Sequence, residues 1–192
     1  MDPRPDSEVL VSSALAFARN KSHQGAAVKV LDLGCGSGCL LLATLSELPD
    51  AYGLGVDCAA LAVAQSRANA ASLSLARRAD FHIGSWAEGV QGQFDIILSN
   101  PPYICEGDAS LSTEVRCYDP DLALFAGQDG LSAYRTLLPQ LGAILAKAGQ
   151  VFLEVGFGQS KAVAQIAEEA GLGLVDIAKD LAGVERCLVL AK

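Results

Sequence analysis

The stretch VKVLDLGCGSG, residues 28–38, runs from an apolar segment into a glycine-rich turn. Val28–Leu33 has the composition of a buried strand. The alternate glycines that follow let the backbone approach a ligand where a Cβ would clash. A helix expected from Gly38 to Leu48 would offer free N–H groups at its start. The order strand, glycine turn, helix predicts the first unit of an α/β fold, although a turn of this kind can also be a plain connection.

Apolar runs and helical segments alternate along the rest of the chain. Further strands are expected at 52–57, 79–83, 94–99, 151–155, 174–179 and 186–190, and further helices at 6–20, 59–74, 130–148 and 159–170. This alternation predicts a Rossmann-like, mostly parallel sheet of seven strands with helices on both faces. Only Asp180–Glu185 separates the last two strands, so they should form an antiparallel hairpin. Pro139 should kink or restart its helix, and Asp6 is the expected N-cap of the first helix.

The length and composition indicate one globular domain over residues 1–192. The chain is 51% hydrophobic and 19% charged, and polar residues or glycines interrupt every apolar run well before eighteen residues. We therefore expect no membrane span, and we expect a cytoplasmic protein because no signal peptide is visible. A net charge of −8 makes the chain a poor electrostatic match for a phosphate backbone.

The six cysteines do not have the spacing of a metal site. Cys35, Cys39, Cys58, Cys105, Cys117 and Cys187 form no CxxC pair, and the chain has only two histidines. We therefore expect reduced thiols and no metal.

An acid ends the second expected strand. Asp57 lies 23 positions after Gly34, at the end of the run YGLGVD. A carboxylate there can accept both hydroxyls of a ribose, so the glycine turn and the acid together predict a cofactor that contains adenosine. The GxGxG spacing favours S-adenosylmethionine over NAD, because S-adenosylmethionine has no pyrophosphate to hold. Trp86, the single tryptophan, either stacks on the adenine or fills a half-buried core position.

The tetrapeptide Asn100-Pro101-Pro102-Tyr103 directly follows the apolar run at 94–99. Two prolines cannot continue a strand, so they stiffen a turn that leaves the carbonyls of Asn100 and Pro101 at the strand's end. An amide oxygen and a bare carbonyl provide two acceptors for the hydrogens of a planar NH2 group, and the Tyr103 ring can stack on its face. The tetrapeptide predicts a pocket for a planar amino or amide group.

Together, these three motifs resemble those of class I S-adenosylmethionine-dependent methyltransferases that act on amino groups. Finer matches over nearly the whole chain resemble the HemK/PrmC family, which methylates the N5 amide of a glutamine in peptide-chain release factors. The matches are PRPDSE at 3–8, EVR at 114–116, DP at 119–120, AL at 123–124, GQDGL at 127–131, YR at 134–135, EVG at 154–156 with Gln159, and DLAG at 180–183 with Arg186.

The resemblance implies roles for residues of this sequence. S-adenosyl-L-methionine, which leaves as S-adenosyl-L-homocysteine, would contact Gly34, Cys35, Gly36, Ser37, Gly38, Asp57, Trp86 and Asn100. Asn100, Pro101 and Tyr103 would be catalytic and, with Pro102, would line the substrate pocket. The protein partner would be a release factor.

The chain departs from the family pattern at three places. Ser85 replaces an acid that commonly precedes the tryptophan, and Ser7 replaces the usual threonine. Family members normally carry a helical N-terminal domain, whereas this chain begins at the catalytic domain. It is therefore either truncated or a short homologue.

Two other functions remain open from the sequence. The same pocket would fit the N6 amino group of adenine in RNA or DNA. The net charge and the lack of a target-recognition insert argue against this alternative. A cofactor-binding partner subunit without activity is the second alternative, against which the intact tetrapeptide speaks. His82 is expected to be a packed or surface residue, and no general base is apparent.

Overall fold

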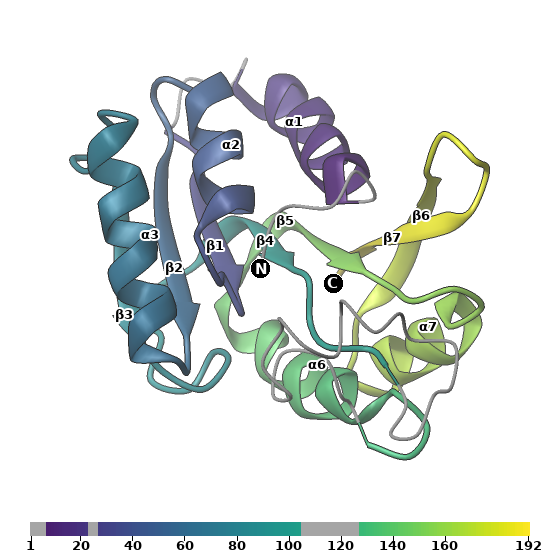
Figure 1. Cartoon of the computed structure of the whole chain (residues 1–192). Helices are drawn as coiled ribbons and strands as arrows, with labels where there is room; N and C mark the ends of the chain where they lie inside the picture. The colour runs from purple at the N-terminus through teal and green to yellow at the C-terminus, as the bar shows by residue number, and fades with distance from the viewer. Residues whose placement is uncertain (1–6, 23–26, 105–126) are drawn as a thin grey trace.

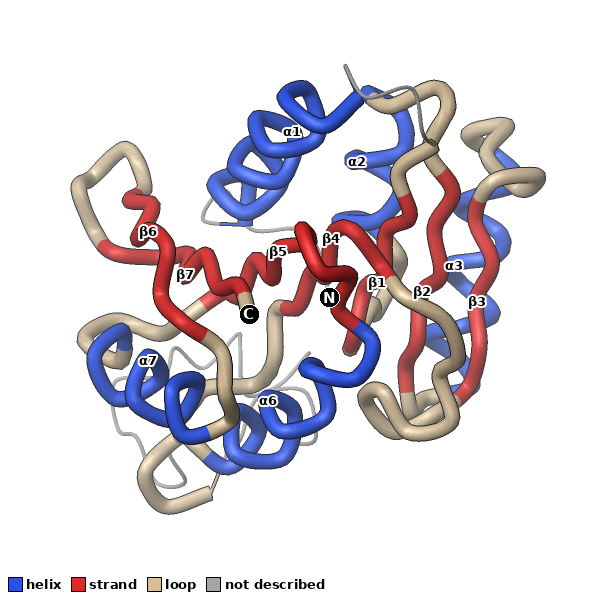
Figure 2. The backbone as a smooth tube through the Cα atoms, turned by 180° about the vertical axis from the view of Figure 1, so that it is seen from behind, coloured by secondary structure: helices blue, strands red, loops and turns tan. Residues whose placement is uncertain are grey.

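The computed structural model describes residues 7–22, 27–104 and 127–192. Seven strands form one sheet in the order β3-β2-β1-β4-β5-β7-β6. The strands are β1 (Lys29–Leu33), β2 (Tyr52–Asp57), β3 (Ala79–Ile83), β4 (Phe94–Ser99), β5 (Leu145–Glu154), β6 (Gly173–Lys179) and β7 (Glu185–Ala191). All neighbours pair in parallel except β7, which is antiparallel to both β5 and β6. The predicted sheet and its terminal hairpin are confirmed (Figure 2).

Helices cover both faces of this sheet (Figure 1). On one face lie α1 (Glu8–Ser22), α2 (Cys39–Glu47) and α3 (Ala60–Ser72), and on the other lie α6 (Ser132–Ile144) and α7 (Ser160–Glu169). Neighbouring residues of a strand point to opposite faces. In β1, Val30 therefore packs under the first three helices, whereas Leu31 packs under the last two. Burial of the central strands on both sides explains why their sequences are apolar without alternation.

The predicted elements agree with the observed ones to within about two residues at most ends, which is the usual uncertainty of helix ends. Three strands, β2, β3 and β4, have the predicted bounds. The helix α6 continues through Pro139 without a restart. The predicted N-cap Asp6, Cys105, Cys117 and the matched motifs at 114–116, 119–120 and 123–124 lie outside the described residues.

The prediction of a helix over 130–148 is wrong in its last turn. α6 ends at Ile144, and the strand β5 begins at Leu145, which pairs with Phe94 of β4. A Cβ added to Gly149 would lie 2.9 Å from the Phe94 carbonyl oxygen, so the two strands approach closely there. Within this segment Leu145 has a register partner in β4, and regular pairing resumes at Gln150 after an irregularity, so sheet pairing at both ends outweighs the helical propensity of so short a segment.

Within the described parts of the chain, no helix is long and apolar enough to cross a membrane.

Candidate functional site

The site lies where the sheet changes direction of winding. β1 has β2 on one side and β4 on the other, and Leu33 is in register with both Val56 and Ser99. The chain therefore leaves β1, β2 and β4 at the same edge, and the segments that follow them meet there. In open α/β sheets this switch point is where ligands bind. The predicted glycine loop, Asp57 and Asn100 thus come together, as their positions at strand ends required.

The glycine loop adopts a backbone that favours glycine. Gly34, Gly36 and Gly38 have φ angles of 73°, 54° and 77°, in the left-handed region where residues with a side chain are strained. The loop is anchored to the neighbouring strand, because Gly34 N and Cys35 N both donate to the Val56 carbonyl, at 2.9 and 3.0 Å. Nothing lies within 4 Å of a Cβ added to Gly36, so the loop is open there, whereas a Cβ added to Gly38 would lie 3.0 Å from Phe81 Cε1.

Asp57 supports the loop as well as facing the site. Its Oδ2 accepts a hydrogen bond from Gly36 N at 2.8 Å, and its Oδ1 accepts one from Ala59 N at 2.9 Å. A carboxylate has about four acceptor sites, so further sites remain for ribose hydroxyls. The side chain is half-buried at the end of β2. The structure is therefore compatible with the predicted ribose contact, which stays a prediction.

Two residues of α3 hold the loop from below, and sequence analysis missed them. Ser66 Oγ donates to the Gly36 carbonyl at 2.8 Å, and Asn69 Nδ2 donates to the Ser37 carbonyl at 2.9 Å. They lie three positions apart, on one face of the helix. Polar residues at this spacing in an alanine-rich helix were the available signal.

Trp86 lies beside the loop. It is half-buried, and a Cβ added to Gly34 would lie 3.4 Å from its Cζ3. The indole also packs at the border of the core on the α6 and α7 face. Trp86 therefore occupies a half-buried position against the core, and its contact with adenine stays a prediction. Cys35 differs, because its side chain is buried in the opposite core, so only its backbone can contribute to the loop's surface.

A buried acid lies directly beneath the glycine loop. Asp32 in β1 is fully buried; its Oδ2 accepts a hydrogen bond from Leu41 N at 3.3 Å, and its Oδ1 has no partner. Burial raises the pKa of Asp32 to about 7, and the charge of Asp57 adds to this shift. The sequence showed an acid within an apolar strand, but no role was assigned to it.

Burial likewise raises the pKa of Cys35, so this thiol stays protonated.

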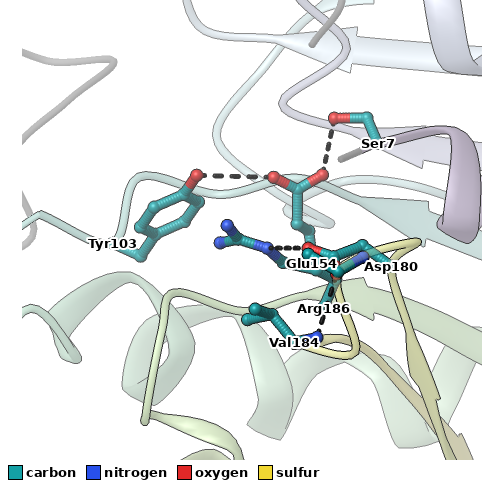
Figure 3. A network of polar contacts seen from close by, with 7 residues as sticks. Ser7, Tyr103, Glu154, Asp180, Val184 and Arg186 are labelled. Carbon is teal, nitrogen blue, oxygen red and sulfur yellow. Dashed lines mark hydrogen bonds and ion pairs between the residues drawn. The ribbon is translucent and has the colours of Figure 1, made fainter. Parts of the chain in front are cut away.

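Asn100 and Tyr103 follow the end of β4 and are held by polar partners, and Figure 3 shows the contact of Tyr103 with Glu154. Asn100 Nδ2 donates to Ser7 Oγ at 3.2 Å, and the Tyr103 hydroxyl donates to Glu154 Oε1 at 3.5 Å. Pro101 is buried between them, and Pro102 is half-buried. The tetrapeptide therefore forms an ordered turn whose two polar side chains are both tied to other elements.

Glu154 and Gln159 organise this turn. Glu154 ends β5, is 1% exposed, and accepts the Ser7 hydroxyl at 2.6 Å. Gln159 donates from Nε2 to the Tyr103 carbonyl at 3.0 Å and accepts from Gly156 N at 3.1 Å. Sequence analysis placed both residues in the family resemblance without a role. The sequence could have indicated them, because Glu154 is a polar residue that ends an apolar strand and Gln159 follows shortly after it.

The remaining polar candidates lie away from the site. His82 is exposed on β3, with Nε2 3.4 Å from Asp80 Oδ2. Among the residues that the structure describes, no three His, Cys, Asp or Glu side chains are grouped as metal ligands would be.

The chain is similar in sequence to known methyltransferases. Residues 7–116 match the model of the methyltransferase small domain. The chain is 50% identical over 190 residues to a release factor glutamine methyltransferase of Rhodospirillum rubrum, covering 98% of this chain and 57% of that protein. It is 40% identical over 193 residues to the enzyme of that name from Agrobacterium fabrum, covering 100% of this chain and 67% of that protein. The chain belongs to the HemK/PrmC family of methyltransferases.

A solved structure supports the fold of this HemK/PrmC-family chain. The ribosomal protein L11 methylase of Lactobacillus delbrueckii superposes with a TM-score of 0.64 at 22% identity, covering 94% of this chain and 77% of that one. This likeness confirms the class I methyltransferase fold. The chain spans about 57% of the length of its Rhodospirillum rubrum relative.

Proposed function

We propose that the chain transfers a methyl group from S-adenosylmethionine to the side-chain amide N5 of a glutamine in a peptide-chain release factor. The observation that carries the proposal is the position of Asn100, at the end of β4, directly beside the glycine loop at the end of β1. A methyl donor and a planar NH2 group would each have matching contacts at this one edge of the sheet. The names of the relatives from Rhodospirillum rubrum and Agrobacterium fabrum support the release factor as substrate.

The residues at the sheet edge fit the cofactor. Gly34, Gly36 and Gly38 would let its methionine part approach the backbone, Asp57 would accept its ribose hydroxyls, and Trp86 would lie near its adenine. When bound, S-adenosylmethionine supplies a methyl group activated by a positively charged sulfur. We further infer that residues 1–192 form one methyltransferase domain that acts in the cytoplasm, where release factors work.

The residues of the tetrapeptide would act on the substrate nitrogen. An amide nitrogen is a weak nucleophile, because its lone pair is delocalised into the carbonyl. Acceptors at Asn100 Oδ1 and the Pro101 carbonyl would orient both hydrogens of the NH2 group and stabilise positive charge that develops there, and Tyr103 would line the pocket. Positioning of this kind can contribute about 7–11 kcal/mol in good cases. The bound cofactor would supply the methyl group from its sulfur to the nitrogen held by Asn100 and Pro101, and this nitrogen would release one proton to solvent.

Methyl transfer to a purified release factor tests the proposal. We expect label from S-adenosylmethionine on one glutamine, located by mass spectrometry. Asn100→Ala should lower kcat by about 100-fold, by analogy with the loss of one oriented oxyanion-hole group, while cofactor affinity is largely kept. Near-normal turnover in Asn100→Ala would contradict the role of Asn100. Label on nucleic acid but not on the release factor would support the adenine alternative, and cofactor binding without any transfer would support a non-catalytic subunit.

A further inference from the structure

We propose that Ser7 and Glu154 are positioning residues that fix which way round the Asn100 amide lies. The inference rests on the proposed function, because the orientation matters only if Asn100 accepts a hydrogen bond from a substrate NH2 group. An asparagine amide has an oxygen and an NH2 group of similar shape. If the amide were reversed, Asn100 would point its own donor at the donor of the substrate.

The hydrogen-bond inventory of the network determines the direction of each bond. An ionised carboxylate can only accept, so the Ser7 hydroxyl must donate its single hydrogen to Glu154, at 2.6 Å. Only lone pairs then remain on Ser7 Oγ. Asn100 must therefore present its Nδ2, which lies 3.2 Å away, and its Oδ1 faces away from Ser7. The orientation of the Asn100 amide therefore follows from the chain of hydrogen bonds, in which Glu154 accepts from Ser7 and Ser7 accepts from Asn100.

Both carboxylate oxygens of Glu154 accept hydrogen bonds in this network. The Tyr103 hydroxyl donates to Oε1 while Ser7 donates to Oε2, so each carboxylate oxygen receives a hydrogen. Arg186 lies on the neighbouring strand β7, where its carbonyl accepts from Val155 N at 2.9 Å. Figure 3 shows the Arg186 guanidinium directed toward the side of the network that holds Tyr103 and Glu154. The Arg186 Nε donates to Asp180 Oδ2 at 3.2 Å.

Burial makes the reversed arrangement costly. Ser7 is 5% exposed and Glu154 is 1% exposed, so water has little access to the bond between them. With the amide reversed, Asn100 Oδ1 would face the Ser7 lone pairs, and neither atom would have a partner there. A buried polar group without a partner is disfavoured more strongly than an ordinary hydrogen bond is favoured. The network thus selects one of two amide orientations of nearly equal shape.

The test compares two substitutions of equal shape at position 7. Ser7→Thr keeps the hydroxyl, whereas Ser7→Val has the form of threonine without it. We expect Ser7→Val to lower kcat for glutamine methylation about tenfold, the size of one neutral hydrogen bond, with KM for the release factor and cofactor affinity little changed. Ser7→Thr should restore kcat. Ser13→Ala in α1, whose hydroxyl donates to the Val9 carbonyl at 2.8 Å, is the control and should match the parent protein.

A double-mutant cycle separates positioning from general stability. If Ser7 acts through Asn100, Ser7→Val should cause no further loss of kcat in the Asn100→Ala background. Additive losses in the cycle, or equal kcat for the Thr and Val variants, would overturn the inference.

Nuclear magnetic resonance tests the orientation in the parent protein without measuring activity, and Asn100→Ala serves only to assign the signals. The side-chain NH2 signals of Asn100, identified by their absence in Asn100→Ala, should show nuclear Overhauser effects to the Ser7 β protons. Signals present without this effect would overturn the inference even if the protein methylates its substrate. Absence of any transfer by the parent protein, with the effect present, would instead reject the proposed function alone.

Discussion

At the scale of single residues, the site combines half-buried polar groups with acids that are almost completely buried. Asp32 lies under the glycine loop with one oxygen unpartnered, and Glu154 lies behind the tetrapeptide with both oxygens bonded. Burial disfavours the charged form of an acid unless partners compensate for the lost water. Glu154 has such partners, whereas Asp32 has a single long bond from Leu41 N.

Asp32 should make the stability of the fold depend on pH. Its pKa rises from 3.8 to about 7 in the folded protein, so between these values the folded state binds more protons than the unfolded state. Stability should therefore fall as pH rises from about 4 to about 7 and then level off, by a few kcal/mol at about 1.4 kcal/mol per pKa unit. Asp32→Asn should remove this slope in urea unfolding at several pH values. Glu47→Gln, an exposed acid on α2, should retain it; an unchanged slope in Asp32→Asn would contradict the assignment.

At the scale of elements, the glycines of β2 are explained by the elements that pack against this strand. Glycines within β2 allow α2 and β3 to pack against it: a Cβ added to Gly55 would lie 2.5 Å from Phe81 Cδ1. These glycines have ordinary strand backbone angles, so they are required because a larger side chain would collide with its neighbours and not because of their conformation. The sequence predicted the strand but gave no reason for its glycines, because the side chains that fill the space belong to other elements.

Gly55→Ala should destabilise the fold by about 1–3 kcal/mol, the usual effect of overpacking a core. Gly142→Ala is the matched control, because Gly142 lies in α6 with nothing within 4 Å of the added Cβ. It should stabilise the fold by about 0.5–1 kcal/mol, since alanine favours a helix. Thermal unfolding of both variants measures the difference, and equal melting temperatures would show that Phe81 moves aside freely.

At the scale of the whole molecule, strand order assembles the site from distant segments. Ser7 lies 93 positions from Asn100 and 147 from Glu154. β4 and β5 are neighbours, and α1 crosses the same face as α2, so these three residues meet at one edge. The net charge of −8 is also a property of the whole chain, and it opposes binding to nucleic acid.

The charge predicts weak binding to nucleic acid. Fluorescence polarisation with a labelled RNA or DNA oligonucleotide at physiological salt should show no saturation in the micromolar range, where non-specific binders typically begin to bind. In an assay of methyl transfer, a release factor should accept the methyl group, whereas the oligonucleotide should neither accept it nor inhibit the transfer. Tight, salt-dependent binding to the oligonucleotide would favour the adenine alternative.

The sequence by itself determined the alternation of strands and helices, the glycine loop, the acid ending β2 and the tetrapeptide ending β4. These are local patterns, because each depends on the conformation and burial of a short segment. The tertiary structure alone decided where β5 begins, which residues support the glycine loop, and that Ser7 and Glu154 contact the Asn100 turn. Hydrogen bonds between distant side chains follow from strand order and packing, and a sequence pattern within one segment contains no record of either.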